Sequence, residues 1–348
     1  MKRKIYQQLL DWKQNRRGNV ALLIEGARRI GKSYIVEKFA QTEYDSYLLV
    51  DFSRVNPKVI EFFELYMDDI DMLLASLELY GKKKLTPRKN ADEEAHSLVI
   101  FDEIQFCPRA RAAIKHLVAD RRYDYIETGS LISIKKNVKD IMLPSEEHAI
   151  EMFPMDFEEF LWATGIGKEW IGNIRECFLQ EKALDESTHN ILLKRFQYYL
   201  LVGGMPEAIN NYLADRNMTR VRQTHRDIHN LYSIDASQYD EDHRLKIRKI
   251  YDLVPSNLEN KKKRMVYKNI EGKKGKTFSD YADEFEYLTN SGVALEVSAI
   301  SNPRFPLVES EQKRLVKLYL NDVGLLTSLL YGLKVNALSQ TIKRVNLG

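Results

Sequence analysis

The sequence predicts an α/β fold: a parallel sheet of about five strands flanked by helices, followed by a mostly helical region and a winged-helix-like domain. Three observations lead to this expectation. Short apolar runs typical of strands alternate with helical stretches or loops over the first 160 residues, which is the pattern of a parallel sheet. A glycine-rich loop follows the first of these runs, and two adjacent acidic residues end the third.

The predicted strands and the segments around them come in this order. The five runs are Val20–Glu25, Tyr47–Phe52, Leu98–Phe101, Tyr123–Thr128 and His148–Phe153. Before the first run, Ile5, Leu9 and Trp12 fall at helical spacing and predict an amphipathic helix packed beside the first strand. The polar segment 82–96 contains Pro87 and predicts a solvated loop before the third strand. Its basic half offers a contact surface as the alternative reading.

Residues 26–33 read Gly-Ala-Arg-Arg-Ile-Gly-Lys-Ser and match the phosphate-loop pattern G-x-x-x-x-G-K-[ST] directly after a strand. Gly26 and Gly31 allow backbone conformations closed to other residues, so successive N–H groups can cradle the β- and γ-phosphates at a helix N-terminus. Lys32 would neutralise phosphate charge and the Ser33 hydroxyl would hold Mg²⁺. An ordinary glycine turn is the weaker reading. The predicted nucleotide contacts are Gly26, Ala27, Arg28, Arg29, Ile30, Gly31, Lys32, Ser33 and Tyr34.

The third run ends in Asp102 and Glu103, which is the Walker B arrangement. An acid at the carboxyl end of a core strand can hold a Mg²⁺-bound water, so Ser33 and Asp102 are the predicted metal residues. Glu103 is then placed to polarise the attacking water. Small-molecule P-loop kinases need no such glutamate, because their nucleophile is the substrate, so the pair favours hydrolysis. The alternative is a strand whose exit happens to be acidic.

A third polar position ends the next strand. In nucleotide-hydrolysing P-loop proteins with an extra strand between the phosphate-loop and Walker B strands, a polar residue ends that strand and senses the γ-phosphate. Thr128, followed by Gly129 and Ser130, occupies this place. The alternative, equally favoured for each of these three residues, is that it simply belongs to a turn of small residues after the strand. The predicted catalytic residues are Glu103, Lys32 and Thr128.

Composition narrows the class of protein. An apolar content of 44% with 10% aromatic residues is ordinary for a globular chain of 348 residues. Lys and Arg number 53 against 50 Asp and Glu, and the net charge of +3 is too small to argue for nucleic acid by itself. Cys107 and Cys177 form no disulfide framework. The polar residues behind Met1–Ile5 exclude a signal peptide, so a reducing cytoplasm is the expected location.

We expect three domains: a P-loop ATPase domain over 1–160, a helical domain over 161–240 and a winged-helix-like domain over 241–348. In the helical part, Gly203 and Gly204 would end one helix and Pro206 would open the next. His225 and His229 have the spacing of a zinc helix, but position 226 is Arg where a metalloprotease needs Glu. The sequence therefore argues against metal ligation at these histidines.

Between residues 243 and 276, twelve Lys and Arg face three Asp and Glu, clustered at 261–264 and 273–276. Such clusters can contact phosphates. A helix over 279–290 and strand-like runs over 293–300 and 314–320 resemble a winged helix. The expected buried stripe of this helix is formed by Tyr281, Phe285 and Leu288. Its expected exposed face is acidic and carries Asp280, Asp283, Glu284 and Glu286. A helix with this acidic face would be repelled by the phosphates that line the major groove of DNA. The preceding lysines could still bind the DNA backbone non-specifically, or bind the acidic face of a protein partner.

The chain resembles one family through the order of its motifs: Gly-Ala-Arg-Arg-Ile-Gly-Lys-Ser, Phe-Asp-Glu-Ile-Gln, Thr-Gly-Ser, Pro-Met-Asp-Phe-Glu-Glu-Phe, Gly-Gly-Met-Pro-Glu-Ala and Leu-Tyr-Leu-Asn-Asp-Val-Gly-Leu-Leu. The family is the bacterial and archaeal AAA-type ATPases in which a P-loop domain precedes a domain of unknown function. The ATPase motifs are generic, but the last three are distinctive together. The resemblance implies ATP as nucleotide and carries the phosphate-loop roles to Gly31, Lys32 and Ser33.

Two departures from this family matter. Relatives often have a Gly-Arg pair shortly after the sensor strand, but here the text reads Leu143-Pro-Ser-Glu-Glu147, which argues against a γ-phosphate contact by an arginine of the same chain. Relatives also usually continue past the position of Gly348 into a nuclease-like domain, and no nuclease chemistry is expected of this chain.

The sequence thus predicts a Mg²⁺-dependent ATPase whose hydrolysis drives or times a movement of the C-terminal half against the P-loop domain. One alternative is a nucleotide-gated scaffold that binds ATP and scarcely hydrolyses it. Another is a DNA-associated ATPase that uses the basic region 243–276, which is also where a protein partner would bind.

Overall fold

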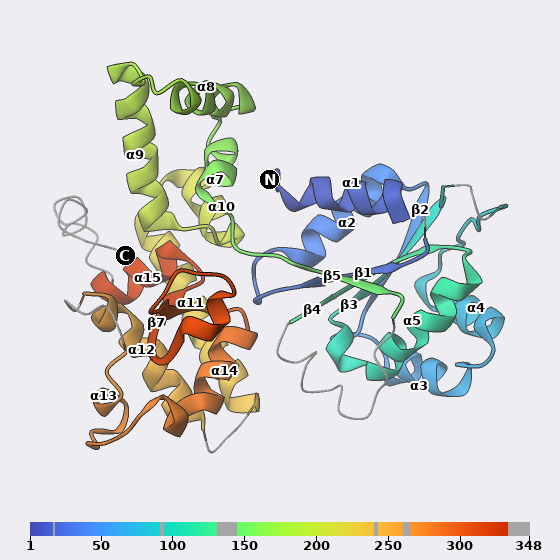
Figure 1. Cartoon of the computed structure of the whole chain (residues 1–348). Coiled ribbons are helices and arrows are strands. Elements are labelled where there is room, and N and C mark those ends of the chain that lie inside the picture. Colours follow the sequence, from blue (N-terminus) through green and yellow to red (C-terminus); the bar gives the residue numbers. More distant parts are fainter. Residues whose placement is uncertain (17, 91–93, 131–144, 240–242, 260–264, 333–348) are drawn as a thin grey trace. The chain divides into compact units, whose positions relative to one another are not determined.

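The computed structural model describes residues 1–16, 18–90, 94–130, 145–239, 243–259 and 265–332 (Figure 1). The chain forms two compact units. One spans Lys2–Met152, and the other spans Phe153–Gly348 together with Met1. Within the described ranges, every helix is too short or too polar to cross a bilayer.

The N-terminal unit is built on a five-stranded sheet in the order β2-β3-β4-β1-β5, and each neighbouring pair is parallel. The strands are β1 Ala21–Glu25, β2 Ser46–Asp51, β3 Ser97–Asp102, β4 Asp124–Gly129 and β5 Glu147–Glu151. The predicted fold class is confirmed, and the strand bounds differ from the predicted ones by one or two residues. The extra strand expected between the phosphate-loop strand and the Walker B strand is β4.

Helices cover both faces of this sheet (Figure 1). They are α1 Ile5–Arg16, α2 Lys32–Glu43, α3 Pro57–Leu65, α4 Ile70–Gly81 and α5 Pro108–Asp120, with a 3-10 turn η1 at Ile104–Phe106. Because side chains alternate along a strand, Val99 and Phe101 face the core shared with α3, α4 and α5, while Leu98 and Ile100 face the other side. The predicted apolar stripe of α1 is confirmed, since Ile5, Leu9 and Trp12 are all buried.

The described part of the polar segment before β3 is a loop with most of its lysines exposed, as predicted, but the expectation is wrong for two residues of its basic half. Leu85 is buried, and Arg88 pairs with Asp124 at the start of β4 while also donating to the Arg121 carbonyl at 3.1 Å. Lys83 lies over the ring of Tyr47, 4.0 Å from its centroid. Arg88 is buried because it pairs with a buried carboxylate that lies 36 residues later in the chain, outside the polar segment.

The C-terminal unit is mostly helical. Its helices are α7 Phe157–Ala163, α8 Lys168–Leu179, α9 Glu186–Val202, α10 Pro206–Asp215, α11 Met218–Tyr239, α12 Arg244–Glu259, α13 Lys268–Glu271, α14 Ala282–Asn290 and α15 Val323–Tyr331. As predicted, Gly203 ends α9 with a φ of 74° and Pro206 opens α10. After α14, strands β6 (Ala294–Ile300) and β7 (Glu311–Leu320) form an antiparallel hairpin, so the expected helix followed by two strands is present.

Helix α14 has the predicted buried stripe, but one of its acidic residues is not exposed. Glu284 is only 2% exposed, and its carboxylate lies 3.6 Å from Lys246 and 3.5 Å from His243. The expectation of a fully exposed acidic face is therefore wrong at this position. The partners come from the sequence around α12, 38 to 41 residues earlier, so helical periodicity within α14 alone carries no sign of them.

The three distinctive motifs of the C-terminal unit meet in one buried junction. The Met155 amide donates to the Gly204 carbonyl at 2.8 Å, and the Gly204 amide donates to the Asp322 carboxylate. A Cβ on Gly204 would stand 1.9 Å from the Met155 carbonyl oxygen, and one on Gly324 would stand 2.6 Å from the Val202 carbonyl oxygen. Glycine is needed here because main chains pack directly against each other. These motifs therefore build a core.

Candidate nucleotide site

The phosphate-loop sequence connects β1 to α2 with the unusual backbone that its glycines allow. Gly26 has a φ of 150°, Arg29 of 67° and Gly31 of 92°. Gly31 is also the N-cap residue of α2, so the loop runs straight into a helix N-terminus. A Cβ at Gly26 would meet the Met152 carbonyl oxygen at 2.3 Å, because the chain leaving β5 passes close by. Such a turn into a helix start is a ready-made anion site.

Lys32 is folded back over this loop. Its Nζ donates to the carbonyls of Gly26 and Ala27, both at 2.9 Å, and the residue is only 5% exposed. Burial lowers the pKa of Lys32 to about 8, while the charges of Glu103 and Asp102 act in the opposite direction. The ammonium group therefore lies within electrostatic reach of both acids at the end of β3. Phosphate oxygens would be stronger acceptors than these two carbonyls.

The hydroxyl of the phosphate loop and the Walker B carboxylate are in direct contact. Ser33 Oγ donates to Asp102 Oδ1 at 2.9 Å, and the Thr128 hydroxyl donates to the same carboxylate oxygen. Burial raises the pKa of Asp102, against the lowering effect of these two hydrogen bonds. A hydroxyl and a carboxylate are oxygen ligands of the kind Mg²⁺ prefers, so the donor set fits this ion. The carboxyl ends of β3 and β4 thus bring together residues from three separate motifs.

Glu103 is held in a strained position beside this pair. Its φ is 55°, a left-handed conformation that costs a non-glycine residue roughly 1–2 kcal/mol. Its amide donates to Thr128 Oγ1 at 3.4 Å, and its carboxylate accepts a hydrogen bond from the Gln105 side chain. Gln105 is almost completely buried and was not among the predicted site residues. The signal that pointed to it was its place in the Phe-Asp-Glu-Ile-Gln motif.

The remaining predicted nucleotide contacts differ in what they expose. Ile30 is fully buried, so only its main chain is available to a ligand, whereas 56% of Tyr34 is exposed. Arg28 is partly exposed and Arg29 is exposed. Arg3, which sequence reasoning missed, donates to the Ile30 carbonyl at 2.9 Å and anchors the loop from 27 residues upstream. No local pattern could have found it, because the contact depends on how the chain before α1 packs.

Comparison with known proteins identifies the domains. A family described as an AAA domain matches residues 18–161, which include the whole loop and both Walker motifs. Residues 18–161 are an AAA-type P-loop ATPase domain. Residues 193–337 match a domain of unknown function, DUF8612, which confirms the resemblance stated from the motifs. An AAA domain implies ATP as the bound nucleotide.

Solved structures support the fold. The Walker-type ATPase PABY2304 of Pyrococcus abyssi is 14% identical to this ATPase, with a TM-score of 0.51 over 94% of this chain and 95% of that one. At that identity the likeness shows the fold alone. Cdc6p from Pyrobaculum aerophilum is 10% identical over 96% of this chain and 93% of that one, but its TM-score of 0.30 carries no argument. No curated protein matches the sequence.

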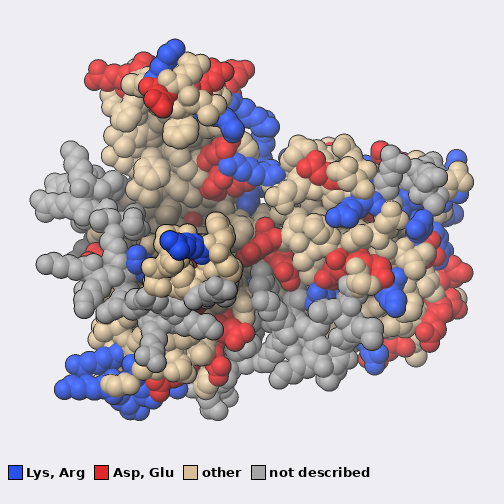
Figure 2. All heavy atoms as spheres, viewed as in Figure 1, with Lys and Arg blue, Asp and Glu red and all other residues tan. Residues whose placement is uncertain are grey.

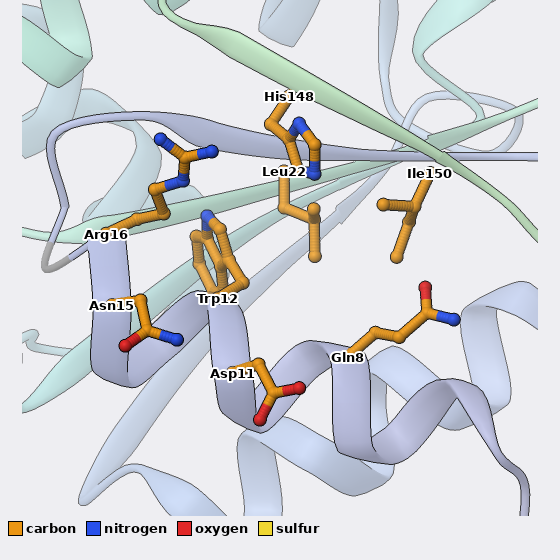
Figure 3. A pocket seen from close by; sticks show the side chains of 8 residues that line it. All are labelled: Gln8, Asp11, Trp12, Asn15, Arg16, Leu22, His148 and Ile150. Carbon is orange, nitrogen blue, oxygen red and sulfur yellow. The ribbon is translucent and has the colours of Figure 1, made fainter.

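A depression in the N-terminal unit is separate from the ATPase loop. It has a volume of about 400 Å³ and lies between α1 and the strands β1 and β5 (Figure 3). The side chains of Leu22, His148 and Ile150 project from the strands toward Trp12 and Gln8 of α1. It contains none of the residues assigned to phosphate, metal or water. Its mixed polar and apolar walls do not suggest a particular ligand.

The basic region of this ATPase is partly neutralised by its own acids. The cluster 261–264 lies outside the described residues. Elsewhere in the region, Lys246, Lys273 and Lys276 have acidic partners at 3.6, 3.8 and 2.9 Å, respectively. Figure 2 shows a remaining basic surface in the area of α13. Since paired lysines offer less to a phosphate backbone, the pairs weaken the argument for DNA binding through this region.

Proposed function

We propose that this ATPase binds ATP with Mg²⁺ at the 26–34 loop and hydrolyses it to drive or time a movement of its C-terminal half. The observation that carries the proposal is the 2.9 Å contact between Ser33 and Asp102 beside the buried Lys32. Three groups needed for phosphoryl chemistry, an ammonium, a hydroxyl and a carboxylate, would otherwise have no reason to converge at one loop.

Each residue has a distinct task in this proposal. Main-chain amides of the loop and the N-terminus of α2 bind phosphate oxygens, and Lys32 exchanges its two loop carbonyls for phosphate. Ser33 and Asp102 would hold Mg²⁺, which neutralises charge developing on the phosphates. Thr128, hydrogen-bonded to Asp102, fixes the carboxylate and lies where a γ-phosphate would be sensed.

Glu103 is the proposed general base for the attacking water. Its carboxylate is at the correct edge of the sheet, but it already accepts a hydrogen bond from Gln105. This same bond favours the second candidate, a nucleotide-gated scaffold in which hydrolysis is slow until the Glu103–Gln105 contact opens.

Two substitutions test the proposal. Lys32→Ala is expected to abolish nucleotide binding, and Glu103→Gln is expected to keep binding while turnover falls about 10²–10⁴-fold, the range for a general base. Glu61→Gln, a like change at an exposed position of α3, is the control and should leave both unchanged. Undiminished turnover in the Glu103→Gln protein would end the role assigned to this residue.

The scaffold and DNA alternatives need separate assays. Gln105→Leu should raise turnover if the Glu103–Gln105 bond restrains hydrolysis, and should leave it low if the bond only positions the base. DNA binding measured across a salt titration, with turnover in the same samples, tests the DNA-associated alternative. A flat response at low salt would exclude it.

A further inference from the structure

A pocket of about 230 Å³ opens in the C-terminal unit between α11, α12 and α15. Three arginines line it: Arg222 and Arg226, one helical turn apart on α11, and Arg248 on α12. Among the described residues that line it, Asp252 is the single carboxylate. Three guanidinium groups face one carboxylate in the lining, and the buried Asp322 carboxylate offsets part of the charge of Arg222. The lining therefore remains positive overall and is suited to an anion.

Arg222 is the buried member of this set, with 2% of its surface exposed. Its Nη1 donates to the Gly324 carbonyl and to Thr327 Oγ1, both at 3.2 Å. Its Nε and Nη2 have no hydrogen-bond partner within the described part of the chain. Both nitrogens are closed to solvent. Because burying unpaired guanidinium N–H groups is costly, an acceptor that a bound anion brings within reach of them would be favourable.

The two outer arginines are available for a ligand. Arg226 is exposed, and no acidic side chain among the described residues forms an ion pair with it. Arg248 lies 3.8 Å from Asp252, with more than half of the Arg248 side chain exposed. An exposed ion pair at this distance contributes little, so the Arg248 guanidinium can turn toward a stronger acceptor at small cost.

His229 forms a neutral wall of the pocket. Its Nδ1 and Nε2 lie 2.7 Å from the Tyr251 hydroxyl and from Ser328 Oγ, and burial lowers the pKa of His229 to about 4. Because the Ser328 hydroxyl donates to the Leu325 carbonyl, it accepts from Nε2–H, and Nδ1 accepts from Tyr251. Both ring nitrogens are thus occupied. Anion recognition is left to the guanidinium groups and the amide of Asn230.

We propose that this pocket binds a phosphate group, either as free phosphate or as the monoester head of a small molecule. A phosphate carries close to two negative charges near pH 7 and presents oxygens that match the planar fork of arginine. At about 30 Å³ per water, the pocket holds roughly eight waters, enough for a phosphate and a small attached group. It is smaller than the roughly 300–1,000 Å³ of pockets for drug-sized ligands, so the part of a ligand that it encloses is small.

The test measures phosphate binding by calorimetry in a Lys32→Ala protein, so that the ATPase loop does not contribute. Orthophosphate and glycerol 3-phosphate are titrated separately. Saturable binding is expected, and Arg226→Ala and Arg248→Ala should each weaken it about tenfold or more, the loss expected of one charge-assisted hydrogen bond. Arg220→Ala, which removes the same charge from α11 outside the pocket, should change affinity less than twofold.

The two ligands distinguish the source of the phosphate. Tighter binding of glycerol 3-phosphate indicates a monoester, and tighter binding of orthophosphate indicates free phosphate. Asp252→Asn removes the opposing charge and should strengthen the binding of either ligand several-fold. Because misfolding would weaken binding, such a gain cannot come from a loss of fold. Absence of saturable binding, or unchanged affinity in both arginine variants and in Asp252→Asn, overturns the proposal. So does arginine-dependent binding of an oligonucleotide in place of both small phosphates.

Discussion

Replacing Gly204 by Ala tests whether the distinctive motifs of the C-terminal unit form a packed junction. A new Cβ would lie 1.9 Å from the Met155 carbonyl oxygen and within 2.8 Å of two further main-chain atoms. Backbone contacts cannot turn away as a flexible side chain does, so the chain after α9 must separate from the strand exit before α7. Two hydrogen bonds depend on the present position, one from Met155 and one to Asp322.

The expected cost follows from these contacts. A neutral main-chain bond contributes about 0.5–1.5 kcal/mol and a bond to a carboxylate about 1.5–3 kcal/mol. Forcing an extra methyl into a packed core adds about 1–3 kcal/mol. Gly204→Ala should therefore lower the free energy of unfolding of the C-terminal unit by about 3–7.5 kcal/mol. The same substitution at Gly172, inside α8 with nothing within 4 Å of a new Cβ, should raise it by about 0.5–1 kcal/mol.

Urea unfolding followed by tryptophan fluorescence measures both effects, because Trp162 and Trp170 lie in this unit. The comparison matters more than either value, since both variants add the same atoms to the same unit. If Gly204→Ala unfolds at the urea concentration of the Gly172→Ala protein, the close approach of Met155 does not stabilise the unit. The interpretation of the motifs as a packed junction would then be wrong.

Three further predictions concern buried charges. Arg88→Ala should lower the free energy of unfolding by about 3–5 kcal/mol in a denaturant titration, because it leaves the buried Asp124 carboxylate without its arginine partner. Burial and the nearby charge of Glu147 raise the pKa of Glu127 well above its usual range. The free energy of unfolding therefore falls as pH rises through the pKa of the folded state. Glu127→Gln should stabilise the protein increasingly toward alkaline pH. Burial raises the pKa of Asp322 from 3.8 to about 6. The contribution of this group to the free energy of unfolding is therefore fully present below pH 3.8 and is lost as pH rises through 6. Relative to Asp322→Asn, the protein should lose about 3 kcal/mol of unfolding free energy between pH 3.8 and pH 7, measured by urea midpoints.

The ATPase half was predictable because its chemistry is encoded at short range. The spacing of Gly26, Gly31 and Lys32 fixes a turn and a helix start, and an apolar run ending in Asp102 can only place that acid at a strand tip. Parallel strands then bring their carboxyl ends to the same edge, which is why Thr128 reaches Asp102. Three local patterns thus imply one site without any knowledge of the packing between them.

Apart from Gln105, which contacts Glu103 two residues away, the positions that sequence reasoning missed depend on distant partners. Arg3 reaches the phosphate loop from the chain before α1, Arg88 reaches a carboxylate 36 residues later, and Glu284 is covered by residues around α12. Composition described their neighbourhoods correctly as polar, yet single side chains within them are buried. Burial of one charged residue is decided by whether a partner arrives, and a sequence window does not contain that partner.

The packed junction and the arginine pocket share one helix, so a change in the first should be felt in the second. Asp322 accepts from Gly204 and also caps the start of α15, while Gly324 and Thr327 of α15 hold the Arg222 guanidinium. Moving α15 would move the two acceptors that orient this arginine. Where Gly204→Ala remains folded, its affinity for phosphate should therefore fall, whereas Gly172→Ala should bind as the parent protein does. Equal affinities in the two variants would mean that Arg222 is oriented by α11 alone and that the motifs serve stability without serving the pocket.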